Sequence, residues 1–320
     1  MSEFGRHSTA DDVLENVDLS GKTVFITGAN SGLGKESARA MAAKGAHVIM
    51  AGRDPAKLDS AFSEITALNP AAKLETILCK LGSLEALRAC TADANTRFEQ
   101  IDILINNAGV MACPLSRTDD GFEMQFGTNH LGHFALTAGL MPLILKSANT
   151  PGSGRIVNLS SRGHFITPVN LEDPNFENRP YDEWLSYGHA KTANVLFSVG
   201  LEKRFAGKGI HAIAVHPGGI ETNLGRHLSE EQRAALTERV TTADPNFEWK
   251  SIAQGAATQV WAATTPELEG RGGLYCEDCH IAEIDDESRV SGVRSYALDE
   301  DAADELWSIS EDMAGAVFTR

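Results

Sequence analysis

The chain has 320 residues, and its 42% hydrophobic and 22% charged content is that of an ordinary globular protein with a sizeable core. Its formal net charge of −16 argues against nucleic acid or an anionic membrane as a partner, because both require a basic surface. The sequence shows neither a signal peptide nor an apolar run of membrane-spanning length. We therefore expect a cytoplasmic protein whose scattered cysteines stay reduced.

Strands and helices alternate along the chain. Strands are predicted at 23–28, 46–52, 73–81, 101–109, 154–161, 209–215 and 272–278. Helices are predicted at 37–45, 55–68, 83–98, 127–145 and 187–205. Near-continuous apolar strands separated by helices indicate a single α/β domain, in which helices cover both faces of a doubly wound parallel sheet.

Three parts of the chain depart from this alternation. Residues 1–20 are predicted to form a separate polar arm with a short helix after a Ser8–Asp11 capping pattern, so that the domain proper spans 21–320. Irregular insertions interrupt the pattern at 163–185 and 221–249. The acidic last fifth of the chain is interpreted as a solvated surface.

The stretch TGANSGLG at 27–34 joins the first strand to the first helix. Glycine allows a sharp turn and a close backbone approach to a pyrophosphate, and the helix that follows offers free N–H groups. This context predicts nucleotide binding, although a glycine-rich loop is often only a turn. The candidate contacts are Gly28, Ser31, Gly32, Leu33 and Gly34.

The end of the second predicted strand, MAGRD, bears on the choice of nucleotide. An acidic residue at this place selects NAD, but here Gly52 occupies it and Arg53 follows. An arginine suits the 2′-phosphate of NADP by charge and geometry. We therefore predict NADP(H) as the cofactor, with NAD(H) as the alternative if Arg53 is a surface residue paired with Asp54.

Tyr187 and Lys191 stand one helical turn apart in SYGHAK. Interconverting an alcohol and a carbonyl requires a group that takes or gives the hydroxyl proton, and a free tyrosine, with a pKa near 10, is a poor base at neutral pH. An ammonium nearby favours the phenolate, so Lys191 is predicted to lower the pKa of Tyr187 and make it an acid/base. Such a pair also arises by chance, so it needs a fold that uses it.

Four separated motifs together resemble the short-chain dehydrogenase/reductase family over about residues 20–280. They are the glycine loop, NNAG at 106–109, NLSS at 158–161, and the Tyr187–Lys191 pair followed by HPGGIET at 216–222. Stretches such as NHLGHFALT and HAKTANVLF are similar to its retinol-dehydrogenase-like branch. The resemblance implies a Rossmann sheet and nicotinamide-dependent alcohol and carbonyl chemistry.

The resemblance also implies roles for individual residues. Ser161, the second serine of its pair, holds the substrate oxygen, and Lys191 also holds the nicotinamide ribose. Asn129 holds a water that links Lys191 to solvent; a structural role in its helix is the alternative. The remaining cofactor contacts are Asn107, Ala108, Gly109, Pro217, Gly218 and Thr222.

Two features do not follow the family pattern. The position where the family usually places an adenine-binding Asp is Lys80, and an ammonium cannot accept a bond from an amine. Cys276-x-x-Cys279-His280 matches a haem-attachment pattern, but attachment requires export. A zinc site would need a second ligand pair at suitable spacing. We predict buried thiols and no metal.

The sequence does not identify the substrate, so only its class is predicted. Apolar residues in 221–249 fit a helical lid over an apolar pocket, and ordinary helix burial is the alternative. A medium-to-large apolar alcohol, aldehyde or ketone fits best. The resemblance implies a homodimer or homotetramer that pairs through the helices carrying NHLGHFALTAGLM and YGHAKTANVLF. A non-catalytic NADP(H)-binding sensor or scaffold is the alternative function.

Overall fold

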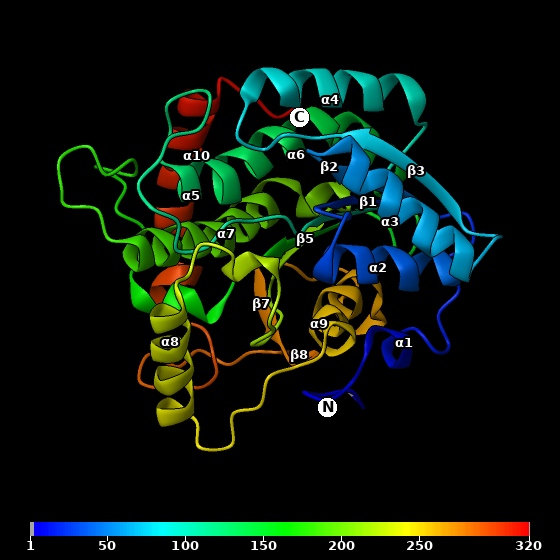
Figure 1. The fold of residues 1–320 in the computed structure, drawn as a ribbon. Helices are drawn as coiled ribbons and strands as arrows, with labels where there is room; N and C mark the ends of the chain where they lie inside the picture. The colour runs from blue at the N-terminus through cyan, green and yellow to red at the C-terminus, as the bar shows by residue number, and fades with distance from the viewer. Residues whose placement is uncertain (1–2, 320) are drawn as a thin grey trace.

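A computed structural model describes residues 3–319 and shows one α/β domain built on an eight-stranded sheet (Figure 1). The strand order is β3-β2-β1-β4-β5-β6-β7-β8, and every pairing is parallel except that of β7 with β8. The strands are β1 Thr23–Thr27, β2 His47–Gly52, β3 Lys73–Leu78, β4 Ile103–Asn106, β5 Arg155–Leu159, β6 His211–His216, β7 Leu274–Glu277 and β8 His280–Ile281. The predicted doubly wound parallel sheet is confirmed.

Helices cover both faces of this sheet. The longer ones are α2 Gly32–Ala43, α3 Pro55–Leu68, α4 Leu84–Arg97, α6 Gly132–Ser147, α7 Glu183–Phe205, α8 Glu230–Ala243, α9 Ile252–Thr264 and α10 Glu300–Ala314. Successive strand residues point to opposite faces: Val24 and Ile26 pack with α2, α3 and α9, whereas Phe25 packs with α4, α6 and α7. Two continuous cores therefore fix the sheet and bring all parallel strands to end at one edge.

The N-terminal segment is not the separate polar arm that the sequence predicts. A short helix, α1 Ala10–Val13, does form, but its cap is Thr9 with Asp12 rather than Ser8 with Asp11. Ala10 and Leu14 are fully buried and belong to the same core as α9. The apolar residues of this segment lie on one side, so they join the domain core while the acids face solvent.

The acidic C-terminal region is more than a solvated surface. It contains α10, whose buried Ala303, Leu306 and Trp307 recur at helical spacing and pack toward α7 and α6. Residues 186–201 of α7 are thereby buried within a single chain. Pairing of two chains through α6 and α7 into a homodimer or homotetramer stays a prediction.

The insertion at 221–249 forms a projecting helical segment. Lys250 N–H donates to Gly219 O at 2.9 Å, so the two ends of the insertion lie side by side. Between them α8 begins with a capping box of Ser229 and Gln232, and every residue of α8 is exposed or half-buried. Figure 1 shows α8 standing apart from the helices that cover the sheet.

The C-x-x-C-H sequence forms the hairpin between β7 and β8. Asp278 and Cys279 occupy its turn with φ of 46° and 59°, and Cys276 lies on β7. Both cysteines are free and buried, as predicted. Residues 3–319 contain no group of three His, Cys, Asp or Glu side chains that could hold a metal ion. No helix within the same range is long and apolar enough to cross a membrane.

Candidate active site

A cavity of about 1540 Å³ lies at the edge where the parallel strands end, and it runs from the glycine loop to the insertion at 221–249 (the lid insertion). It gathers most of the residues that the sequence singles out. These are Gly28, Ser31, Gly32, Leu33, Arg53, Asn107, Ala108, Gly109, Ser161, Tyr187, Lys191, Pro217, Gly218 and Thr222. Two predicted residues, Gly34 and Asn129, do not line the cavity, and the structure gives each of them a different task.

The glycine loop has the backbone that a close ligand requires. Gly28 and Gly32 have φ of +67° and +54°, a region that side chains disfavour. Ser31 is the N-cap of α2, and its hydroxyl makes no cap bond, so it is available to a ligand at the helix N-terminus. A Cβ atom on Gly34 would lie 2.5 Å from Asn107 Nδ2. Gly34 is therefore needed for packing and not for ligand contact.

Thr27, a residue that the sequence did not single out, joins the glycine loop to the NNAG segment. Its hydroxyl oxygen accepts from the N–H groups of Asn107 and Ala108 at 2.8 and 3.0 Å. His133 Nδ1 lies 2.9 Å from the carbonyl of Asn129, so it carries the proton, and Nε2 accepts from the Thr27 hydroxyl at 2.9 Å. Burial lowers the pKa of His133 to about 4, which keeps this tautomer neutral.

Asn129 lies in a π-helical turn, Gly127–Leu131, between the short α5 Met124–Phe126 and α6. Its side chain pairs with both backbone groups of Val110: Nδ2 donates to Val110 O at 2.9 Å, and Oδ1 accepts from Val110 N at 2.8 Å. Its carbonyl is bonded by His133. Asn129 therefore has the structural role that the sequence offers as the alternative. Its role in a water relay to Lys191 stays a prediction.

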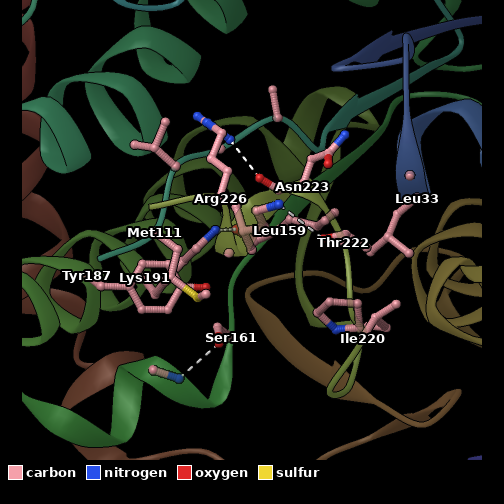
Figure 2. Close-up of a pocket in the computed structure, with 18 of the residues that line it drawn as sticks. Leu33, Met111, Leu159, Ser161, Tyr187, Lys191, Ile220, Thr222, Asn223 and Arg226 are labelled. Carbon is pink, nitrogen blue, oxygen red and sulfur yellow. Dashed lines mark hydrogen bonds between the residues drawn. The ribbon is translucent and has the colours of Figure 1, made fainter. Parts of the chain in front are cut away.

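Ser161 and Tyr187 meet in the cavity (Figure 2). Ser161 follows β5, and its Oγ accepts from Gly163 N at 3.0 Å as the cap of a 3₁₀ turn, Arg162–Ile166. A Cβ atom on Gly163 would lie 2.7 Å from the Tyr187 ring, so this glycine lets the ring come close. Ser160 instead donates to Lys191 O at 2.8 Å inside the core. Of the two serines, Ser161 is the one whose hydroxyl is bonded beside Tyr187.

Lys191 and Tyr187 are both buried on α7, with Lys191 Nζ 5.7 Å from the Tyr187 ring centroid. Lys191 Nζ donates to Leu159 O at 2.9 Å. Burial lowers the pKa of Lys191 to about 8. Burial also raises the pKa of Tyr187 to about 12, against the smaller lowering effect of its hydrogen bond with Ser161. In the protein alone, desolvation of the phenolate outweighs the bond with Ser161, and the lowering of the tyrosine pKa by Lys191 beside an oxidised nicotinamide stays a prediction.

His164 links the C-terminal segment 283–298 to Ser161. Its Nδ1–H donates to Ser161 O at 2.7 Å, and its Nε2 accepts from Arg294 N at 3.2 Å. Its own carbonyl accepts from the Tyr296 hydroxyl. Burial lowers the pKa of His164 to about 4, so the ring is neutral and its tautomer is set by these partners. No local sequence pattern marks this contact.

The part of the site around Arg53, where the sequence predicts nucleotide selection, also differs from expectation. Asp54 caps α3 and pairs with Lys57 at 3.7 Å, so the alternative in which it pairs with Arg53 is not observed. Arg53 is exposed at the cavity. Lys80 is ion-paired with Asp119, a cavity-lining residue from a distant loop. This acid lies beside the position where the chain lacks the family's Asp, and sequence reasoning missed it.

Comparisons with known proteins agree with this geometry. The family model described as short chain dehydrogenase matches residues 22–233. A short-chain dehydrogenase/reductase, prx1, of Penicillium roqueforti is 38% identical over 95% of this chain and 89% of its own. Retinol dehydrogenase 12 of Mus musculus is 40% identical over 94% and 88%. The crystal structure of an uncharacterised protein from Mycobacterium paratuberculosis superposes with a TM-score of 0.73, with 34% identity over 98% of this chain and 100% of that one.

Proposed function

Because the chain belongs to the short-chain dehydrogenase/reductase family of oxidoreductases, we propose that it interconverts an apolar alcohol and its ketone or aldehyde with NADP(H). The observation that carries the proposal is the meeting of Ser161 and Tyr187 in the cavity that also holds the glycine loop. One continuous cavity thus joins a proton-transfer pair to a nucleotide-binding backbone.

The residues present fit a dinucleotide. The positive φ of Gly28 and Gly32 leaves a cradle without side chains at the N-terminus of α2, where phosphates are stabilised. Arg53 offers a guanidinium to a 2′-phosphate, and Thr222 lies across from Gly32. When bound, the nicotinamide supplies or accepts the hydride. Lys191 is the proposed partner of the nicotinamide ribose.

The proton comes from the chain itself. At neutral pH the raised pKa keeps Tyr187 protonated, so its hydroxyl can donate to a carbonyl oxygen that Ser161 Oγ holds. The ammonium of Lys191, one turn along α7, stabilises the phenolate that remains after transfer. In the reverse direction the phenolate takes the proton of an alcohol.

The test is a cofactor-oxidation screen with purified protein across steroids, retinoids, aryl ketones and aliphatic aldehydes. We expect NADPH to be consumed with at least one apolar carbonyl. Tight binding of NADPH without turnover of any of them would favour the sensor or scaffold alternative. A cytoplasmic location and a homodimer or homotetramer remain part of the proposal, tested by fractionation and by light scattering.

A further inference from the structure

The cavity has the opposite charge balance to the rest of the chain. Ten of its lining residues are Lys or Arg and four are Asp or Glu, whereas the whole chain has 28 basic and 44 acidic residues. A cleft lined by one sign of charge concentrates the field inside it. An acidic protein that keeps a basic cavity is built to take anionic ligands there.

The arginines in the cavity are left without acidic partners. Seven are arginines: Arg53, Arg162, Arg226, Arg233, Arg239, Arg289 and Arg294. Within residues 3–319, none of the seven has a carboxylate oxygen within 4.0 Å. Arginines outside the cavity are commonly paired, as Arg39 is with Asp11 and Arg97 with Glu75. The unpaired charge is thus concentrated where a ligand binds.

Part of this charge belongs with the dinucleotide. Arg226 comes from the lid insertion, where its Nη1 donates to Asn223 O at 3.0 Å (Figure 2). Burial and the nearby Arg53 cation lower the pKa of Arg226. Burial, Arg226 and Arg53 likewise lower the pKa of His227. These three groups therefore gather at the end of β2. Binding of the dinucleotide phosphates explains why these three groups lie together.

Arg162 lies elsewhere, next to Ser161, and Arg289 lies in the segment that Arg162 contacts. Arg162 directly follows Ser161. Its Nη1 donates at 2.7 Å to the carbonyl oxygen of Val290, the residue after Arg289. Its backbone N–H donates to His216 Nδ1 at 3.4 Å, at the end of β6. The two guanidinium groups thus come from adjoining segments at the substrate end, and the dinucleotide phosphates at the glycine loop do not account for them.

The acid Glu277 lies near Arg162 but forms no ion pair with it. The Glu277 carboxylate is buried and accepts from Gly292 N at 2.7 Å, and burial raises its pKa although the Arg162 cation acts the other way. Arg289 is exposed and lines the cavity. A ligand reaching this place meets uncompensated positive charge.

The walls around these arginines are apolar and aromatic. Phe247 of the lid insertion packs edge-on against Trp249 at 5.0 Å and lies 6.0 Å from the Arg162 guanidinium. Phe165 and Trp184 also line the cavity. Aromatic walls with cations among them suit an amphipathic molecule, whose body packs on the rings while an anionic group meets the arginines.

We propose that the substrate is an apolar carbonyl compound or alcohol that also carries a carboxylate or comparable oxyanion, held by Arg162 and Arg289 at the mouth of the cavity. The inference rests on the proposed function and names the substrate class of the same site. Guanidinium groups bind such oxyanions through paired charge-assisted hydrogen bonds. The anionic group is a different part of the molecule from the reacting carbonyl, so it selects the substrate without taking part in proton transfer.

The test compares matched acids and esters. Aryl aldehydes with a para carboxylate, attached directly or through two or four methylene groups, are assayed with NADPH beside their methyl esters. We expect kcat/KM for at least one acid to exceed that of its ester about tenfold or more. Arg162→Gln and Arg289→Gln should each lower this ratio, and the double variant should bring it near one. Arg271→Gln, an exposed arginine outside the cavity, is the control and should leave the ratio unchanged.

A binding measurement separates this inference from the proposed function. Calorimetry with 4-phenylbutanoate and its methyl ester, at saturating NADPH, needs no turnover. Preferential binding of the acid, lost in the double variant, supports the anion site even if no aldehyde is reduced. Esters that equal or exceed every acid in both experiments would overturn it. So would variants that weaken NADPH binding and lower acid and ester activity equally, since the arginines would then serve the cofactor phosphates.

Discussion

The two ends of the cavity are built in different ways. At the nucleotide end, the Thr27 side chain at the end of β1 bonds to backbone N–H groups that follow the neighbouring strand β4, and Gly34 fits against Asn107 with no room for a side chain. At the substrate end, segment 283–298 is held by the side chains of His164 and Arg162. The nucleotide end is therefore set by neighbouring strands of the regular sheet, and the substrate end by bonds to segments outside the parallel strands. Substitutions at the two ends should separate cofactor binding from substrate turnover.

Tyr187→Phe, where the two ends meet, should have the largest effect. Removing the hydroxyl leaves the ring packed on Gly163 but removes the proton donor, so kcat should fall by at least ~10². NADPH binding, measured by fluorescence, should stay near wild type. A variant that turns over at close to the wild-type rate while binding NADPH normally would show that Tyr187 is not the acid/base.

Arg53→Ala should affect the nucleotide end alone. Loss of a charge-assisted bond to the 2′-phosphate should raise the Kd of NADPH about tenfold or more, with a much smaller effect on NADH. Arg88→Ala, exposed and outside the cavity, is the matched control. Equal weakening of both cofactors, or a preference of the wild type for NADH, would contradict the assignment of Arg53.

His164→Ala should affect the substrate end alone. It breaks the link between Ser161 and the segment that carries Arg294, so kcat should fall about tenfold, the scale of one or two buried hydrogen bonds. Because the ring is neutral, the pH–rate profile between about 6 and 9 should keep its shape. His164→Asn retains a donor near the position of Nδ1 and should recover part of the rate. An unchanged NADPH Kd in both variants distinguishes local positioning from general unfolding.

The smallest expected effect is a shared loss of stability in acid. His133 and His164, one at each end, have folded-state pKa values of about 4, below the unfolded value of about 6.5. Their contribution to stability is complete above about pH 6.5 and is lost as the pH falls toward 4. By about pH 5.5 each should cost the protein ~1 kcal/mol of unfolding free energy. Urea unfolding at pH 7.5 and 5.5 measures this, and equal stability at both values would contradict it.

Much of the nucleotide end could be predicted because its signals are local. The glycine loop follows a strand directly, and strand, loop and helix are neighbours in sequence. Even there, boundaries were misjudged: β4 was expected to run to 109 but ends at Asn106, because Asn107 turns to bond with Thr27. α9 and α10 were not predicted. In α10 the many acids hid a helical spacing of Ala303, Leu306 and Ser310 that could have revealed it.

The sequence by itself predicted the alternation of strands and helices and the glycine loop, and the motifs of its family resemblance predicted Ser161, Tyr187 and Lys191 as the catalytic set. These follow from periodicity and short motifs, which act over a few residues. The tertiary structure alone decided that Asn129 holds Val110, and that burial raises the pKa of Tyr187 to about 12. It also decided that Arg162 meets Val290, 128 positions away along the chain. Desolvation and long-range hydrogen bonds depend on which segments the folded chain brings together, and no local pattern records that.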